Sequence, residues 1–145
     1  MRRSRLFWLC NIIVPLLLGL LIYLAYRPEA IITSLLSKVI PITPRPAESS
    51  LEKMLSSYGP DILWAYGLTF YNICVLHHRR YSAFKVFLIS FITELLIELL
   101  QKTKIINGTF DYFDVLLEFL VTTMVIALYY FNLNRNIDKY QNRRS

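Results

Sequence analysis

The chain has 145 residues, of which 55% are hydrophobic and 18% are charged, and its formal net charge is +6 at pH 7. This length suits a single domain, while the share of apolar residues exceeds that of an ordinary small soluble protein. A basic soluble chain would suggest a nucleic-acid partner. Here the basic residues gather beside apolar runs, so the positive-inside rule of membrane proteins explains the charge, and no nucleic acid is expected.

Four continuous apolar stretches are long enough, or nearly so, to cross a bilayer as helices, which takes about 20 apolar residues. They cover residues 6–26, 60–76, 81–100 and 114–133. Because these runs do not alternate with polar residues, they argue against strands. The sequence therefore predicts an all-α, polytopic membrane protein with four transmembrane helices in a single membrane domain, 1–145. The second stretch is short and is expected to depend on tilt or on Trp and Tyr anchors.

The first apolar stretch follows a cluster of arginines, a pattern that also begins a signal peptide. This stretch is longer than the core of a signal peptide, about 7–15 residues, and no small-residue cleavage site follows it, so we expect a retained helix. Pro15 and Gly19 are expected to kink it. Cys10 and Cys74 are isolated in the sequence and form no metal or redox motif, so both are interpreted as packing residues.

The basic residues predict the orientation of the helices. With four spans, three basic groups fall on one face of the membrane: the first residues of the chain, the hinge at 77–80 and the tail at 134–145. The positive-inside rule makes that face cytoplasmic, so both termini are expected in the cytoplasm. The tail itself is predicted either as a short surface helix or as a frayed end.

A long segment, 27–59, connects the first two stretches on the opposite, outer side. Apolar residues recur at helical spacing over 30–40, which predicts an amphipathic helix lying on the membrane surface. Three prolines within 41–46 end it. A second short helix is predicted over 47–57, with Ser49 or Ser50 as its cap. Residues 58–61 are predicted to form a turn, with Pro60 in the first turn of the following helix.

Two acidic stripes flank the connection between the last two apolar stretches. Glu94, Glu98 and Gln101 are spaced to share one helix face, and Asp111, Asp114 and Glu118 share another if that helix begins near Phe110. The short connection makes these helices antiparallel neighbours, so the two stripes should face each other near the outer boundary. Glu94 should be the deepest, about 10 Å below the loop. Carboxylates beside hydrocarbon are costly, which makes these residues the candidate functional groups.

Three interpretations of this cluster remain open. It is a buried polar network that fixes helix register, a binding site for a cationic or polyhydroxylated headgroup, sugar or peptide, or a metal-assisted or acid/base catalytic site. Lysines 102 and 104 are close enough in sequence to pair with it, and Arg27 or Lys53 could reach it from the outer segment. Asp61 begins the second stretch, where it either meets the helix dipole or joins the cluster. No known nucleophile or phosphate-binding motif is present.

At these same positions the chain resembles the VanZ-like family of small bacterial membrane proteins. An E-x-x-Q pattern falls at Glu98 and Gln101, and a D-x-x-D step follows a glycine-containing loop, at Gly108, Asp111 and Asp114. The start of the second stretch, at 60–67, resembles the family's earlier helix start. The resemblance covers roughly residues 61–130. It departs from the family at Glu118, where Asn is common, and at Thr122 and Thr123, which replace glycines.

The resemblance implies about four or five transmembrane helices in the bacterial inner membrane and a role in the cell envelope. The family's namesake is associated with glycopeptide resistance. The function expected here is a non-enzymatic envelope protein that binds a lipid headgroup, a cell-wall component or a protein partner, without a cofactor. The candidate ligand-binding residues are Glu98, Gln101, Asp111 and Asp114, supported by Glu94, Glu118 and Asp61. Two alternatives stay open: a small enzyme acting on a lipid-linked substrate with a carboxylate-bound divalent cation, and a subunit of a transport or secretion complex. Membrane lipids are expected partners, and a protein partner or a homo-oligomer is a further candidate.

Overall fold

The computed structural model describes residues 5–27, 45–77, 82–106 and 110–141, and side chains within these ranges except those of 5, 77 and 132–141. Within them the protein is all-helical, as predicted, and contains no strand. The four helices are α1 (Arg5–Tyr26), α3 (Ser50–His77), α4 (Ala83–Lys102) and α5 (Tyr112–Gln141). The predicted surface helix at 30–40, most of the basic hinge and the loop at 107–109 lie outside the described residues.

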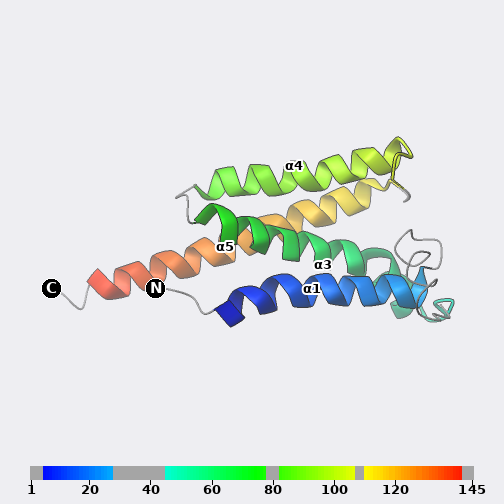
Figure 1. The fold of residues 1–145 in the computed structure, drawn as a ribbon, viewed down its shortest axis with the longest axis horizontal. Coiled ribbons are helices and arrows are strands. Elements are labelled where there is room, and N and C mark those ends of the chain that lie inside the picture. Colours follow the sequence, from blue (N-terminus) through cyan, green and yellow to red (C-terminus); the bar gives the residue numbers. More distant parts are fainter. Residues whose placement is uncertain (1–4, 28–44, 78–81, 107–109, 142–145) are drawn as a thin grey trace.

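The helices run alternately up and down in an elongated bundle (Figure 1). The start of α1, the end of α3, the start of α4 and the end of α5 lie at one end of the bundle, and the opposite helix ends lie at the other. Helix α3 is central, since it packs against α1, α4 and α5, while α4 also packs against α5. We call the end that holds Tyr26, Lys102 and Tyr112 the loop end, and the other the terminal end.

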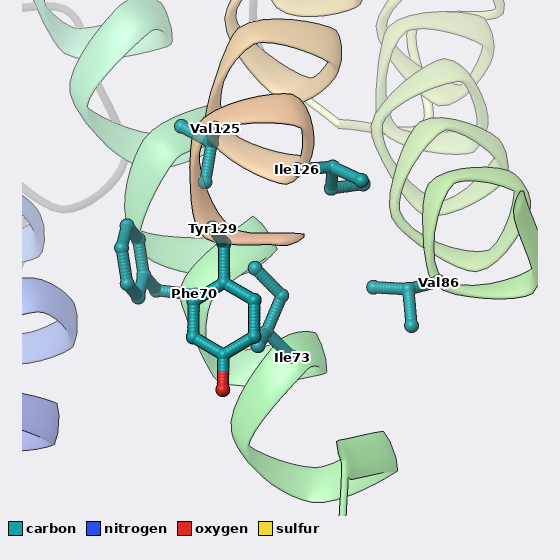
Figure 2. Packing of buried hydrophobic residues seen from close by; sticks show 6 residues of the cluster. All are labelled: Phe70, Ile73, Val86, Val125, Ile126 and Tyr129. Carbon is teal, nitrogen blue, oxygen red and sulfur yellow. The ribbon is translucent and has the colours of Figure 1, made fainter. Parts of the chain in front are cut away.

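The apolar core lies toward the terminal end, between α3, α4 and α5. It consists of buried side chains from the three helices (Figure 2): Phe70, Ile73, Val86, Val125, Ile126 and Tyr129. Helix α1 joins this core through Trp8, whose ring centroid lies 6.4 Å from that of Phe70 and 6.0 Å from that of Tyr129. All four helices therefore contribute side chains to the apolar core or to its edge.

Glycines allow α1 and α3 to approach each other closely. A methyl group at Gly19 would overlap the indole ring of Trp64, and one at Gly67 would lie 3.0 Å from Leu16 Cγ. Small residues at a helix interface allow the two backbones to approach closely. The fit depends on the absence of a side chain at both glycines.

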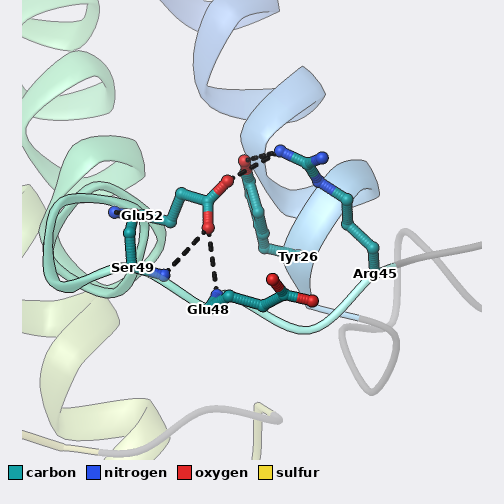
Figure 3. A network of polar contacts seen from close by, with 5 residues as sticks. All are labelled: Tyr26, Arg45, Glu48, Ser49 and Glu52. Carbon is teal, nitrogen blue, oxygen red and sulfur yellow. Dashed lines mark hydrogen bonds and ion pairs between the residues drawn. The ribbon is translucent and has the colours of Figure 1, made fainter.

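Helix α3 begins with the predicted serine cap but differs from the predicted helix–turn–helix. The Ser49 hydroxyl accepts from the Glu52 backbone N–H at 3.1 Å, while the Glu52 carboxylate accepts from the backbone N–H groups of Ser49 and Glu48 (Figure 3). This is a reciprocal capping box. From Ser50 the helix then continues without a break through residues 58–61, so the prediction of a turn there was wrong.

The helix continues through Pro60 because its lost backbone hydrogen bond is replaced from outside the helix. A proline cannot donate to the carbonyl four residues earlier, which leaves the Ser56 carbonyl without its usual partner. The Arg27 side chain donates to Ser56 O at 3.0 Å through Nε and to Ser57 O at 2.8 Å through Nη2. The end of α1 thus stabilises the proline-containing turn of α3, which sequence patterns alone do not show.

Two of the helices, over Leu6–Tyr26 and Tyr112–Phe131, are long and apolar enough to cross a membrane. These ranges overlap the first and fourth predicted spans. Helices α3 and α4 overlap the second and third, but they carry more polar residues, including Asp61 and Asn72 on α3 and Glu94 on α4. Helix α5 continues to Gln141, so most of the predicted tail belongs to it.

Candidate functional site

Polar side chains at helical spacing on three helices form a buried column between α3, α4 and α5. On α4, positions 86, 90, 94 and 98 are all buried, so one face of the helix points into the bundle. Its glutamates Glu94 and Glu98 are only 2% and 3% exposed, and Glu118 on α5 is 7% exposed. The other fully or nearly buried polar residues of the column are Thr69, Asn72, Ser90 and Thr122. Position 90 to position 98 spans about 12 Å along the helix.

The inner half of this column is hydrogen-bonded. The Thr122 hydroxyl lies 2.9 Å from both carboxylate oxygens of Glu94 and 3.1 Å from the Thr69 hydroxyl. One step closer to the apolar core, the Asn72 amide donates to the Ser90 hydroxyl at 3.0 Å. These contacts connect all three helices. This half of the cluster therefore has the hydrogen bonds that the interpretation as a structural polar network requires.

The outer half of the column has acceptors without donors. Within the described part of the chain, three buried carboxylate oxygens have no hydrogen-bond partner: Glu98 Oε2, Asp114 Oδ1 and Glu118 Oε2. A buried acceptor left without a partner costs about 1–3 kcal/mol, and more when it is charged. Such groups are rare in folded proteins and call for an explanation, such as a catalytic role, a bound water or an ion. The inner half of the acidic cluster is therefore hydrogen-bonded, while the outer half has carboxylate oxygens without a donor.

Charge accumulates at the same place. Glu98 interacts electrostatically with Asp61, Asp111 and Asp114. Glu118 interacts in the same way with Glu94, Glu98, Asp61 and Asp114. The Asp61 carboxylate accepts a hydrogen bond from Tyr23, so Asp61 joins the cluster and is not merely a group at a helix start. Arg27 provides opposing charge to Asp61 and Asp114. Because its guanidinium already donates to two carbonyls of α3, it compensates the cluster only in part.

Two of the predicted site residues, Asp111 and Gln101, are not buried in the column. Asp111 precedes α5 and caps it, since its Oδ1 accepts from the Phe113 backbone N–H at 2.9 Å. It is exposed and does not continue the stripe of Asp114 and Glu118, so the prediction of a three-residue face was wrong at this position. Its backbone N–H instead donates to the Glu98 carboxylate. Gln101 is half-buried in the last turn of α4.

The lysines near the cluster form no ion pair with its carboxylates among the described residues. Lys102 Nζ lies 4.8 Å from the ring centroid of Phe110 and 5.8 Å from that of Tyr112, a cation–π arrangement and not an ion pair with the carboxylates. Lys104 is exposed and has a left-handed backbone, with φ of 58°. Lys53 is exposed near the start of α3. Of the four candidate cations, Arg27 is the one at the cluster.

A separate exposed network lies at the loop end. Arg45 Nη2 pairs with Glu52 Oε1 at 2.7 Å and donates to the Tyr26 hydroxyl at 3.2 Å (Figure 3). The backbone N–H groups of Ser49 and Glu48, followed by the charge of Arg45, lower the pKa of Glu52. This network joins the end of α1 to the start of α3 and does not include the acidic column.

The described residues contain no group of three or more His, Cys, Asp or Glu side chains arranged to hold a metal ion. Hard cations need several oxygens within about 2.0–2.6 Å of one point. The alternative of a carboxylate-bound divalent cation therefore has no preformed ligand set in the described part of the protein.

Sequence reasoning missed the uncharged members of the column. Thr69, Thr122, Asn72 and Ser90 carry no charge, so they did not stand out within apolar stretches. The signal was present on α4, where Ser90 lies four residues before Glu94 and continues its stripe. On α5, Thr122 likewise follows Glu118 by four residues.

The chain matches no family model, no curated protein and no solved structure. The resemblance to the VanZ-like family therefore stays a prediction based on the quoted motif residues. The interpretation of the site depends on its own geometry.

Proposed function

We propose that this chain is a four-span membrane protein of the bacterial cell envelope, VanZ-like, which binds a polar ligand in its acidic column. The ligand is a lipid headgroup, a cell-wall component or a segment of a protein partner. Glu98, Asp114 and Glu118 contact it, while Asp61 and Asp111 set the charge at the loop end. Glu94 is held by Thr122 and supports the site from below.

The distribution of polar and apolar side chains supports the assignment to a membrane. In water, large apolar groups gather inside and carboxylates stay outside. Here the glutamates of α4 are buried, while its outer surface exposes large apolar side chains: Phe84, Leu88, Ile89, Ile92, Leu96, Ile97 and Leu99. An apolar surface of this extent requires a covering medium or partner. Lipid covers all four helices without requiring any further protein.

This distribution also supports four spans. Asp61, Asn72 and Glu94 make α3 and α4 more polar than a typical membrane helix, but these side chains face other helices. Intramembrane polar groups normally face the interior of a bundle in this way. With α3 and α4 crossing between the two strongly apolar helices, the terminal end of the bundle lies at the cytoplasmic face, as the basic residues predict.

The observation that carries the binding function is the set of three buried carboxylate oxygens without partners, on α4 and α5. A purely structural network would satisfy its acceptors, as the inner half of the column does through Thr122. The outer half is instead ready to accept donors from another molecule. Such convergent polar groups within an apolar surrounding are typical of ligand sites.

Native mass spectrometry after mild extraction tests this function. The wild-type protein should retain a bound species, and the conservative variant Glu98→Gln should lose most of it. Glu52→Gln is the matched control, because Glu52 lies in the exposed network at the start of α3 and should leave the species in place. Equal retention by wild type and Glu98→Gln would refute the proposed function. A circular dichroism spectrum of each variant establishes that its helices are intact.

A further inference from the structure

The two ends of the acidic column have different surroundings among the described residues. At the loop end, exposed Asp111 and half-buried Asp114 lie beside the buried carboxylates. Toward the terminal end, the column passes through hydrogen-bonded Asn72 and Ser90 and then meets the apolar core around Ile73. Figure 2 shows side chains of this core, which come from α3, α4 and α5. The carboxylates without partners therefore lie nearer the loop end than the apolar core.

The occupant of the outer half must supply hydrogen-bond donors and positive charge. Glu98 and Glu118 are both more than nine-tenths buried, and each has one oxygen without a donor; Asp114 provides a third such oxygen. Asp61 and Asp114 act electrostatically on both glutamates, and Arg27 offsets this repulsion only in part, so a cation would stabilise their ionised forms. A sugar hydroxyl would supply donors but no charge. A cation with N–H groups supplies both.

Among cations, a primary ammonium fits these carboxylates better than a metal ion or a quaternary amine. Metal ions need oxygens within about 2.0–2.6 Å, and the described residues provide no such group. An ammonium has three N–H donors and bonds carboxylates at about 2.7–2.9 Å, a longer distance than a metal–oxygen bond. A quaternary ammonium has no N–H group and would leave all three oxygens without a partner.

We propose, building on the proposed function, that the outer half of the column binds a primary ammonium group at Glu98 Oε2, Asp114 Oδ1 and Glu118 Oε2. The group is carried either by a lipid headgroup or by a soluble amine. Both sources present the same three donors, and both reach the column from the loop end. The site discriminates against methylated amines by hydrogen bonding, not by charge alone.

Paired headgroups test this inference directly. The protein is reconstituted in phosphatidylcholine nanodiscs with and without added phosphatidylethanolamine, and its unfolding temperature and bound lipid are measured. Soluble ethanolamine and choline are titrated separately. We expect phosphatidylethanolamine to raise the unfolding temperature and to be retained preferentially. Stabilisation by ethanolamine as well assigns the binding to the ammonium itself, and stabilisation by the lipid alone assigns it to a lipid ligand.

Variants then locate the site. Glu98→Gln and Asp114→Asn should each weaken the preference for the primary amine about tenfold or more, because each removes one charge-assisted hydrogen bond. Glu52→Gln should leave it unchanged. If wild type shows no preference for either primary amine over its trimethyl counterpart, the inference is overturned. That comparison needs no variant, so it decides the question even if Glu98→Gln does not fold.

The two proposals fail in different ways. If no amine preference appears but Glu98→Gln still loses the species that co-purifies with wild type, the ammonium assignment is wrong and the binding function stands. If that species is retained by Glu98→Gln as well, the binding function is wrong too. An amine preference that all column variants keep in full would show that the ammonium binds outside the column, which contradicts the inference.

Discussion

Arg27 provides a sharp test of how α3 continues through a proline. Its guanidinium donates to Ser56 O at 3.0 Å and Ser57 O at 2.8 Å, where Pro60 removes a backbone donor. Each such charge-assisted bond contributes about 1.5–3 kcal/mol, part of which water recovers once the side chain is removed. We expect Arg27→Met, which keeps the apolar stem, to lower the free energy of unfolding by about 2 kcal/mol.

A double-mutant cycle with Pro60→Ala isolates this effect. Alanine at 60 restores a backbone N–H that donates to Ser56 O, so Arg27→Met should cost less in that background. The expected coupling is about 1 kcal/mol, within the range for residues that share a partner. The effect of the Arg27 charge on Asp61 and Asp114 is present in both backgrounds and cancels. Unfolding by SDS in mixed micelles, followed by circular dichroism, measures the four free energies. Additivity of the two substitutions would refute the explanation.

Three further predictions concern single sites. Gly19→Ala should lower the free energy of unfolding by about 1–3 kcal/mol, because the new methyl group overlaps an indole ring of α3; wild-type stability would contradict the close packing of α1 and α3. Thr122→Val should lower the free energy of unfolding by about 1–3 kcal/mol in the same assay, because the buried Glu94 carboxylate loses the hydroxyl that donates to it. The control Thr123→Val removes only an exposed bond within its own helix and should stay within about 0.5 kcal/mol; equal costs would contradict the network. An NMR titration should find the pKa of Glu52 lower in the folded than in the unfolded chain, because backbone N–H groups favour its carboxylate. Its contribution to stability is therefore present above the unfolded pKa and lost as the pH falls through the folded pKa; equal pKa values would contradict the capping box.

The helices and most of the acidic cluster could be predicted from the sequence because both follow from local spacing. Glu94 and Glu98 lie four residues apart and share a buried face, as expected. Asp114 and Glu118 have the same spacing on α5. A short connection between the last two helices was enough to make the stripes face each other. These features require no knowledge of distant contacts.

The features that could not be predicted depend on groups outside the local pattern. The proline at 60 is typical of a helix start, and only Arg27, at the far end of another helix, explains why α3 continues past it. Lys102 was expected beside the carboxylates, but the rings of Phe110 and Tyr112 offer it an alternative partner. Asp111 was placed on a helix face because the start of α5 was predicted too early, near Phe110 instead of at Tyr112. Asp111 lies three residues before Asp114, and this spacing fits both a residue that caps α5 and a residue on the same helix face.

The central claim is that α4 crosses lipid with its carboxylates turned inward. A nitroxide spin label at Leu96, which is 54% exposed on the outer face of α4, tests this claim most directly. In a bilayer, the account predicts that collisions of the label with dissolved oxygen exceed those with a water-soluble nickel complex. A label at Lys104, exposed beyond the end of α4, should show the opposite order. Preferential collision of the Leu96 label with the nickel complex would contradict the account.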